Sequence, residues 1–268
     1  MENMKMVRPL LFLLAASACA GSAPPAASSG ALSSAEAPSP GAASAQARAI
    51  VEAPDRIESD RKLDSGRRPA ELLSFLGVAT GMRVAELVAG AGYTAELLAR
   101  AVAPNGVVYA QNPKFVLEGA EAPWRERLAR PAAKPIVRVD RELDDPLPPE
   151  AKDLDLVLVN LVYHDTVWLG VDRDKMNQAV FAALRKGGHY AVIDHSARRG
   201  TGFADVKTLH RVDEAAVRAE VERAGFVLRS ESNFLRNPSD MRDWNDAPAA
   251  AAERRGTSDR FALLFVKP

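Results

Sequence analysis

Short apolar runs alternate with amphipathic stretches along most of the chain. The clearest example is an apolar run that predicts a strand over 83–87, followed by two glycines that predict a turn and by helical spacing of apolar residues over 93–102. Glu96 and Arg100 lie one turn apart in this helix, and we expect them to pair on its exposed face. The stretch therefore predicts strand, loop and helix.

The same alternation continues to the C-terminus. Apolar runs predict strands over 107–110, 136–139, 153–160, 190–193, 226–229 and 261–266. Amphipathic spacing predicts helices over 69–76, 124–129, 174–186 and 213–225. The run over 156–159 is apolar throughout, as expected for a central strand covered on both faces. The alternation predicts an α/β fold with a parallel, doubly wound sheet.

The glycine turn after the first strand is a candidate ligand site. In a parallel sheet, small ligands bind at the carboxyl ends of the strands and beside helix N-termini. Glycine lets the backbone approach a ligand more closely than a residue with a Cβ allows. Turns of this kind also serve packing alone, so the glycine pair by itself leaves ligand binding open.

The first 20 residues have the order of a secretory signal. Lys5 and Arg8 precede an apolar run over 10–16, and small residues follow it. The run is too short to span a bilayer. Cys19 is the only cysteine, and it stands where bacterial lipoprotein signals place the cysteine that is acylated after cleavage; an ordinary signal cleavage is the alternative. We expect export to the periplasm of a bacterial cell envelope, with a lipid anchor at Cys19.

Composition separates a linker from one folded domain. Residues 21–46 are mostly Ala, Ser, Pro and Gly, which predicts a disordered tether, and we expect the folded domain over 47–268. Lys plus Arg equals Asp plus Glu, at 35 each, so no global field favours nucleic acid. We expect a small-molecule partner, no nucleic acid and membrane contact only through the lipid anchor. The oligomeric state is not predicted.

Six motifs, in this order, resemble the predicted class I S-adenosylmethionine-dependent methyltransferases of bacteria: ELVAGAGYTAELL, VNLVYHD, LRKGGHYAVIDHSA, LHRVDEAAVRAEVERAGF, FLRNPSD and TSDRFALLFVKP. The resemblance covers about residues 55–268. It implies a Rossmann-like doubly wound sheet of seven strands with an antiparallel last strand. It also implies S-adenosyl-L-methionine as cofactor and methyl transfer to an unidentified acceptor.

The resemblance also implies where the cofactor binds. Glu86 would face the ammonium group, the glycine loop would face the carboxylate, and Asn160 would lie under the transferred methyl. Gln111 and Asn112 stand at the ribose position, where many relatives have an acidic residue, and an amide bonds a diol more weakly than a carboxylate does. The expected cofactor-binding residues are Glu86, Val88, Ala89, Gly90, Gly92, Tyr93, Gln111, Asn112, Asp140 and Asn160.

Candidate catalytic residues follow the later strands. They are Tyr163, His164, Asp165, His195 and His210. Because the carboxyl ends of parallel strands meet at one edge, these residues could share a crevice. Methyl transfer needs alignment and, for some acceptors, removal of a proton, which a histidine can perform near neutrality. We expect His164 to do so, with His195 and His210 as alternatives.

Other interpretations of these residues stay open. The histidines could equally serve only to hold loops by hydrogen bonds. No tight ligand spacing indicates a metal, so we expect none, although the histidines and carboxylates keep a metal site as an alternative.

Two other functions remain as alternatives. S-adenosylmethionine is not expected to be plentiful outside the cytoplasm, so the domain could be a binding or scaffold module of the cell envelope without catalysis; alternatively, translation from an internal start would give a cytoplasmic form. A nicotinamide-dependent reductase shares the fold type, but the sequence lacks G-x-G-x-x-G.

Overall fold

The computed structural model describes residues 43–268. The expected signal, Cys19 and the linker up to residue 42 lie outside the described residues. The first described helix, α1 (Ala45–Val51), begins two residues before the expected domain boundary at 47. Its N-cap is Ser44, whose side chain accepts a hydrogen bond from the backbone N–H of Ala47.

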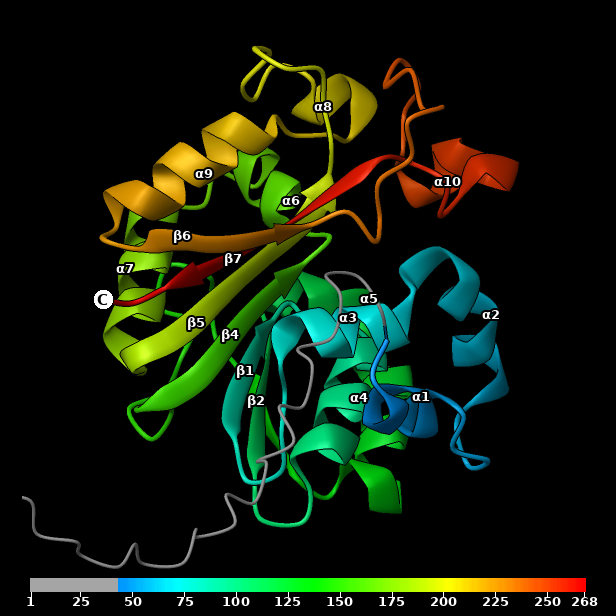
Figure 1. Ribbon diagram of the computed structural model, residues 1–268, viewed down its shortest axis with the longest axis vertical. Helices are drawn as coiled ribbons and strands as arrows, with labels where there is room; N and C mark the ends of the chain where they lie inside the picture. The colour runs from blue at the N-terminus through cyan, green and yellow to red at the C-terminus, as the bar shows by residue number, and fades with distance from the viewer. Residues whose placement is uncertain (1–42) are drawn as a thin grey trace, which may run out of the picture. The chain divides into compact units, whose positions relative to one another are not determined.

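Seven strands form one sheet in the order β3-β2-β1-β4-β5-β7-β6. The strands are β1 (Arg83–Leu87), β2 (Val107–Asn112), β3 (Ile136–Asp140), β4 (Leu154–Asn160), β5 (Leu184–His195), β6 (Val227–Ser232) and β7 (Arg260–Val266). The strands β1 to β5 pair in parallel, while β7 runs antiparallel between β5 and β6. This arrangement confirms the expected α/β sheet and its antiparallel last strand (Figure 1).

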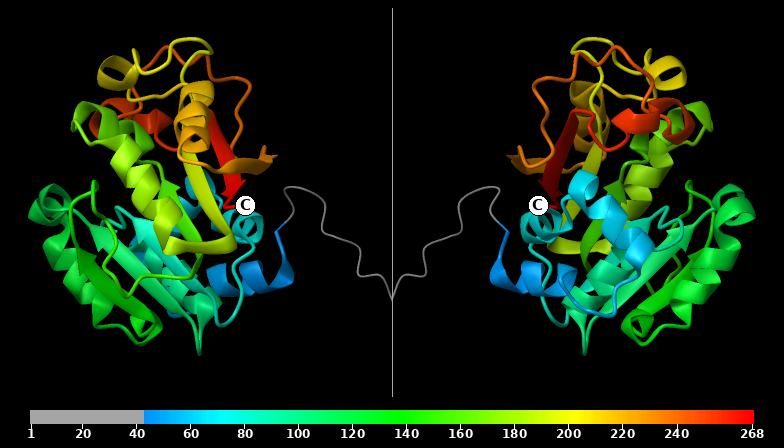
Figure 2. Two further views of the ribbon diagram at one scale, coloured as in Figure 1. Left: turned by 90° about the vertical axis from the view of Figure 1, so that its left-hand side faces the viewer. Right: turned by 90° about the vertical axis from the view of Figure 1, so that its right-hand side faces the viewer.

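Helices lie on both sides of the sheet, as the side views in Figure 2 show. The longer ones are α2 (Glu58–Arg67), α3 (Pro69–Leu76), α4 (Tyr93–Val102), α5 (Lys114–Leu128), α7 (Arg173–Ala183) and α9 (Glu214–Arg223). The short ones are α6 (Tyr163–Trp168), α8 (Val206–Leu209), α10 (Pro248–Ala251), η1 (Pro131–Ala133) and η2 (Ala252–Arg254). One apolar cluster contains residues of α3, α4 and α5, and a second contains residues of α6, α7 and α9. The sheet therefore has a core on each face.

The segment before β5 differs from its expected structure. The helix expected over 174–186 ends at Ala183, and the strand expected over 190–193 already begins at Leu184. Leu184 pairs with Leu154 of β4, and the backbone N–H of Gly187 donates to the carbonyl of Lys267 at 2.8 Å. Arg185, Lys186 and Gly187 have the residue types that often end a helix, but here they belong to β5. Strand pairing outweighs this local signal.

The helix expected over 124–129 begins earlier, at Lys114 in α5. Gly119 and Pro123 lie inside this helix, and both residues are usually signs of a helix boundary. Its inward face carries Trp124 and Arg127, which are both buried. Packing of this face holds a helix that local propensity would break.

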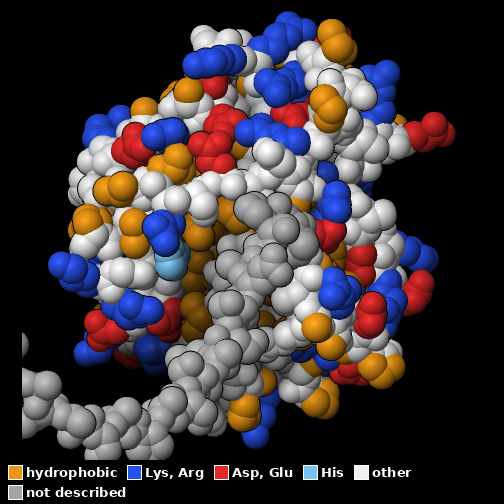
Figure 3. Space-filling view, viewed as in Figure 1, with side chains coloured by type: hydrophobic (Ala, Val, Ile, Leu, Met, Phe, Trp, Pro, Cys, Tyr) orange, Lys and Arg blue, Asp and Glu red, His pale blue; other side chains and the backbone are white. Residues whose placement is uncertain are grey.

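The surface shows no single dominant charge. On the face drawn in Figure 3, acidic and basic side chains are interspersed, in keeping with their equal totals. Within residues 43–268, no helix combines the length and the apolar character needed to cross a bilayer.

Candidate active site

The loop after β1 is held open by two side chains at the end of β2. Gln111 Oε1 accepts a hydrogen bond from the N–H of Val88 at 3.0 Å, and Asn112 Oδ1 accepts one from the N–H of Gly90 at 2.7 Å. Asn112 Nδ2 also donates to the carbonyl of Gly90 at 3.0 Å. Gln111 and Asn112 are fully buried. In this structure these amides shape the loop, and their expected contact with a ribose stays a prediction.

Three residues of this loop have positive φ angles, 58° at Val88, 58° at Gly90 and 82° at Gly92. A Cβ at Gly90 would meet no atom within 4 Å, whereas a Cβ at Gly92 would lie 2.3 Å from the ring of Trp124. Gly90 thus borders open space, and Gly92 is required for packing against α5. A β-branched residue with a positive φ has a strained backbone, so the loop carries backbone strain at Val88.

Glu86 lies at the end of β1, beneath this loop. The side chain is 3% exposed, and among the described residues its Oε2 atom has no hydrogen-bond partner. Burial raises the pKa of Glu86 to about 8, against the lowering effects of a hydrogen bond with Thr94 and the charges of Arg67 and Arg127. A buried acceptor without a donor leaves a place that a cationic group of a ligand would satisfy.

The other expected cofactor-binding residues lie in the loop or at the ends of β4 and β3. The N–H of Ala89 donates to the carbonyl of Gln111 at 2.9 Å, which continues the bonding between loop and β2. Asn160 ends β4, next to β1, and its Nδ2 donates to Thr94 Oγ1 at 3.3 Å. Asp140 ends β3 and accepts a hydrogen bond from Arg138 at 2.9 Å.

Tyr93, the first residue of α4, contacts α2. Its hydroxyl donates to Asp64 at 2.7 Å, and the guanidinium of Arg67 lies 4.5 Å from the ring centroid. This contact brings α2 against the N-terminus of α4.

A cavity of about 450 Å³ lies beyond the ends of β4 and β5. It is bounded by α2 and by the segments around α6, α8 and α10, which meet at this end of the sheet in Figure 1. Its lining includes Asp165, His195 and His210, together with Leu161, which directly follows Asn160. The structure thus brings three of the expected catalytic residues to one cavity, adjacent to the end of β4.

His164 lies behind the cavity, in contact with the other histidines. Its ring centroid is 4.1 Å from that of His210 and 5.4 Å from that of His195. Nδ1 of His164 is 2.6 Å from Asp194 Oδ1. Burial lowers the pKa of His164, but the charges of Asp194 and Asp165 and their hydrogen bonds outweigh it and raise the pKa to about 10. His164 is therefore protonated near neutrality, which disfavours the expected role as a base.

Tyr163 does not face the cavity, contrary to expectation. It is fully buried, and its hydroxyl donates to Glu220 Oε2 at 2.9 Å and accepts from Asn177 Nδ2 at 2.9 Å. These contacts point it into the core between the sheet and the helices α7 and α9, because the first turn of α6 places neighbouring residues on different faces.

His195 is oriented by a buried carboxylate. Its Nδ1 lies beside Asp246 Oδ2, within hydrogen-bond distance, and 2.9 Å from Ser258 Oγ. Burial raises the pKa of Asp246, but the hydrogen bond from His195 outweighs this, so the net pKa is lowered and the carboxylate stays charged. Since Nδ1 is engaged, Nε2 is the nitrogen that remains for chemistry.

His210 differs from His164 in its titration. It is half-buried, and burial together with the nearby His164 lowers the pKa of His210. The pKa shifts of these two neighbouring histidines therefore have opposite directions.

Among the cavity residues that were not found from the sequence are Arg67 and Arg260. Arg260 is buried, burial lowers its pKa to about 10, and it donates to the carbonyl of Gly256 at 2.9 Å. Within the described part of the chain, neither arginine has a carboxylate within salt-bridge distance. Nothing in the strand or helix pattern signals such a cation, although Arg260 lies in the motif TSDRFALLFVKP.

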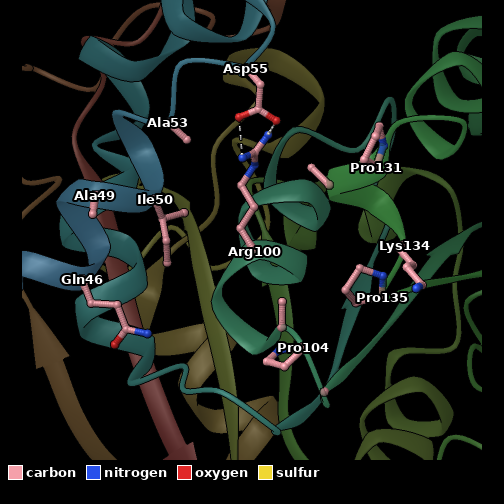
Figure 4. Close-up of a pocket in the computed structure, with 13 residues that line it drawn as sticks. Gln46, Ala49, Ile50, Ala53, Asp55, Arg100, Pro104, Pro131, Lys134 and Pro135 are labelled. Carbon is pink, nitrogen blue, oxygen red and sulfur yellow. Dashed lines mark hydrogen bonds and ion pairs between the residues drawn. The ribbon is translucent and has the colours of Figure 1, made fainter.

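A larger cavity, of about 730 Å³, lies at the opposite edge of the sheet and is drawn in Figure 4. Its wall is mainly apolar, with Ile50, Pro104 and Pro135 among its residues, and the ion pair of Arg100 with Asp55 (2.8 Å) borders it. Because Pro104 and Pro135 precede β2 and β3, this cavity is beside the amino ends of the strands. It contains none of the expected site residues, so the smaller cavity is the candidate active site.

Comparisons with known proteins agree with this geometry. No family model and no curated protein matches the sequence. Among solved structures, a SAM-dependent methyltransferase from Aquifex aeolicus is similar with a TM-score of 0.53 and 17% identity, over 78% of this chain and 97% of that chain. A putative sarcosine dimethylglycine methyltransferase from Galdieria sulphuraria has a TM-score of 0.52 and 16% identity, over 79% and 91%.

A chain in the complex between a methyltransferase activator and a putative methyltransferase from Haloferax volcanii has a TM-score of 0.54 and 13% identity, over 84% of this chain and 98% of that chain. At such identities the likeness concerns the fold. The strand order, with β7 inserted antiparallel between β5 and β6, is shared with this group. The chain therefore has the fold of the class I S-adenosylmethionine-dependent methyltransferases.

Proposed function

We propose that this protein transfers a methyl group from S-adenosyl-L-methionine to a small-molecule acceptor. Two neighbouring features carry the proposal. The buried Oε2 of Glu86 has no hydrogen-bond donor in the described chain, and a Cβ at Gly90 would meet no atom within 4 Å. A cation beside a carboxylate and close approach to a glycine loop are what the methionine end of this cofactor requires. The residues present therefore fit the group.

The chain's own residues would hold the donor without a phosphate cradle. Glu86 would accept hydrogen bonds from the ammonium, and the loop over 88–92 would approach the ligand through its backbone. Asn160 would border the reacting centre from the end of β4. When bound, the cofactor supplies an electrophilic methyl on its sulfonium, and the protein's main task is then alignment.

The acceptor would occupy the cavity of about 450 Å³. Leu161 lies in its wall, one residue after Asn160, so the cavity adjoins the place expected for the donor methyl. Arg67 and Arg260 lie in the same wall and have no carboxylate partner among residues 43–268. Arg260 is buried and Arg67 is half-buried. Guanidinium groups without a carboxylate partner favour a negatively charged ligand, so we infer an acceptor that carries a carboxylate or a similar anion.

His195 is the best-supported base in this site. The carboxylate of Asp246 holds Nδ1, which fixes the ring and stabilises the positive charge that forms when Nε2 takes a proton. His164 serves this role less well because two carboxylates keep it protonated.

A test of the function is analysis of the ligand that co-purifies with the full chain. We expect mass spectrometry of the denatured protein to find S-adenosylmethionine or its demethylated product, and less of either with Gly90→Val. The absence of both molecules, together with no binding on addition of the donor, would contradict the proposal and favour an envelope module without catalysis.

Substitution of His195 separates alignment from proton removal. Once an acceptor is identified, His195→Asn should lower turnover by about 100-fold or more while donor affinity stays unchanged, since a positioned base contributes about that much. Asp246→Asn should lower turnover less and shift its pH profile. Unchanged turnover with His195→Asn would show that His195 is not the base.

A further inference from the structure

Three side chains outside the core of the sheet form a compact set of metal-type ligands. His164 and Asp165 lie in α6, and His210 follows α8. Nε2 of His164 is 3.2 Å from Asp165 Oδ1, and Nε2 of His210 is 3.7 Å from the same oxygen. One ligand atom from each residue lies within 4.8 Å of the other two. Around an ion bound at about 2.1 Å, neighbouring ligands are about 3 to 3.5 Å apart, so only small movements are required.

The buried ring of His164 gives an independent indication. Nε2 of His164 is buried and lies 3.2 Å from Asp165 Oδ1, so this nitrogen is directed at the carboxylate of the proposed site. The other nitrogen, Nδ1, is held by Asp194 at 2.6 Å, and Asp194 in turn accepts hydrogen bonds from the backbone N–H groups of His164 and His195 at 2.7 Å. A carboxylate on the second nitrogen is the usual partner of a metal-binding histidine, because it fixes the ring and raises its basicity.

The carboxylate of Asp165 is also fixed in place. Trp168 Nε1 donates to its Oδ1 at 2.9 Å. Two acceptor atoms, Nε2 of His164 and Oδ1 of Asp165, then face each other unless a proton or a cation lies between them. The site is thus built to hold positive charge.

We propose that His164, Asp165 and His210 bind one divalent transition-metal ion. Two imidazoles and one carboxylate suit Zn²⁺ or Fe²⁺, whereas Mg²⁺ and Ca²⁺ prefer sites made of oxygen ligands. Asp165 and His210 line the cavity of about 450 Å³, so the remaining coordination positions face that cavity. This inference does not rest on methyl transfer. The sequence contains no ligand spacing of the usual kind, because the ligands come together only when α6 and the end of α8 pack against β5.

The proposal is tested by metal titration of the untagged full chain after chelator treatment. Zn²⁺ in competition with a chromophoric chelator should bind at one equivalent, and Co²⁺ should give an absorption spectrum in the visible range that signals nitrogen ligands. His210→Ala and Asp165→Asn should each weaken Zn²⁺ binding by more than about 100-fold, and Asp194→Asn by about 10- to 100-fold.

His189 provides a matched control. It is one of the two histidines that are not proposed ligands, lies in β5 opposite Leu156 and Val266, and takes no part in the cluster. His189→Ala should leave Zn²⁺ binding unchanged. Asp165→Asn preserves the side-chain shape and is checked for folding by circular dichroism, so the test does not depend on the buried His164. Absence of stoichiometric binding to the wild-type chain, or binding that is equal in wild type, Asp165→Asn and His210→Ala, would overturn the proposal.

Discussion

Gly90 and Gly92 differ in what they do, although they are two residues apart and share a positive φ. A side chain at Gly92 would collide with Trp124, while a side chain at Gly90 would extend into open space. The sequence predicted the turn, since glycines after a strand are a strong local signal. It could not tell which glycine borders a ligand, because the answer depends on α5, which follows only after the whole of α4 and β2.

The buried Glu86 should make the stability of the protein depend on pH. Burial raises its pKa to about 8 from an ordinary 4.5, so the folded state is favoured when the group is protonated and loses stability as the pH rises from about 4.5 to about 8. A pKa difference of one between the folded and unfolded states corresponds to about 1.4 kcal/mol in the free energy of unfolding. We expect Glu86→Gln to be more stable than wild type at pH 8, by up to a few kcal/mol, and this difference to shrink toward pH 4.5.

Urea unfolding of both proteins across this pH range measures the effect. Glu126→Gln, an exposed position on α5, is the control, and its difference from wild type should not change with pH. If the difference in the free energy of unfolding between Glu86→Gln and wild type did not change with pH either, the pKa of Glu86 would not be raised in the folded protein.

Among the elements, α2, α4 and α5 are joined by buried charges. Arg127 of α5 pairs with Asp60 of α2 at 2.8 Å and with Glu96 of α4 at 2.7 Å. Glu96 also pairs with Arg100 at 2.8 Å, as expected, but its side chain is only 3% exposed. The expectation that this pair lies on an exposed face is therefore wrong, because α5 and α2 cover that face of α4.

Removal of Arg127 should be costly. A buried ion pair that loses one partner leaves uncompensated charges, which typically destabilises a protein by about 3 to 5 kcal/mol. We expect this loss for Arg127→Met in urea unfolding, and a change of less than about 0.5 kcal/mol for Arg125→Met, which removes an exposed arginine of the same helix. Equal effects of the two substitutions would show that the network does not hold these helices.

Elements were predictable where one strong local signal decides the structure. The strand over 83–87, the helix over 93–102 and the helix over 213–225 were all predicted, and in each case apolar spacing and turn residues agree. The start of β5 was not predicted, because Gly187 and its basic neighbours are residues that often end a helix. Pairing with β4 and the hydrogen bond to Lys267 outweigh this signal. The full length of α5 was hidden by Gly119 and Pro123.

In the whole molecule, the glycine loop over 88–92 and the cavity of about 450 Å³ both lie at the carboxyl ends of the strands. Glu86 and Asn160 end adjacent strands, and His195 ends the next one. The sequence predicted that such residues share an edge, because parallel strands align their carboxyl ends. It did not predict the contacts among His164, His195 and His210, which depend on how the segments outside the sheet fold back over it.

The N-terminal region concerns location rather than chemistry, and Cys19 lies outside the described residues. We propose that Cys19 is acylated and anchors the protein in the bacterial cell envelope, on the periplasmic side. Such an anchor would be stable if two acyl chains are attached, since one chain alone binds a membrane only weakly. Cys19→Ser should then move the protein from the membrane fraction to the soluble fraction, and radiolabelled fatty acid should attach to the wild type only. Failure of the wild type to incorporate fatty acid would favour ordinary secretion.

Donor binding is the central claim, and calorimetric titration of the full chain with S-adenosylmethionine tests it most directly. We compare wild type with Gly90→Ala and with Gly77→Ala. Gly77 has a φ of 63° and open space beside it, so both alanines introduce the same backbone strain, but only the one at position 90 occupies the expected ligand position. We expect one site per chain in wild type and Gly77→Ala and a large loss of affinity in Gly90→Ala. Equal affinities in all three proteins, or no binding by the wild type, would contradict this expectation.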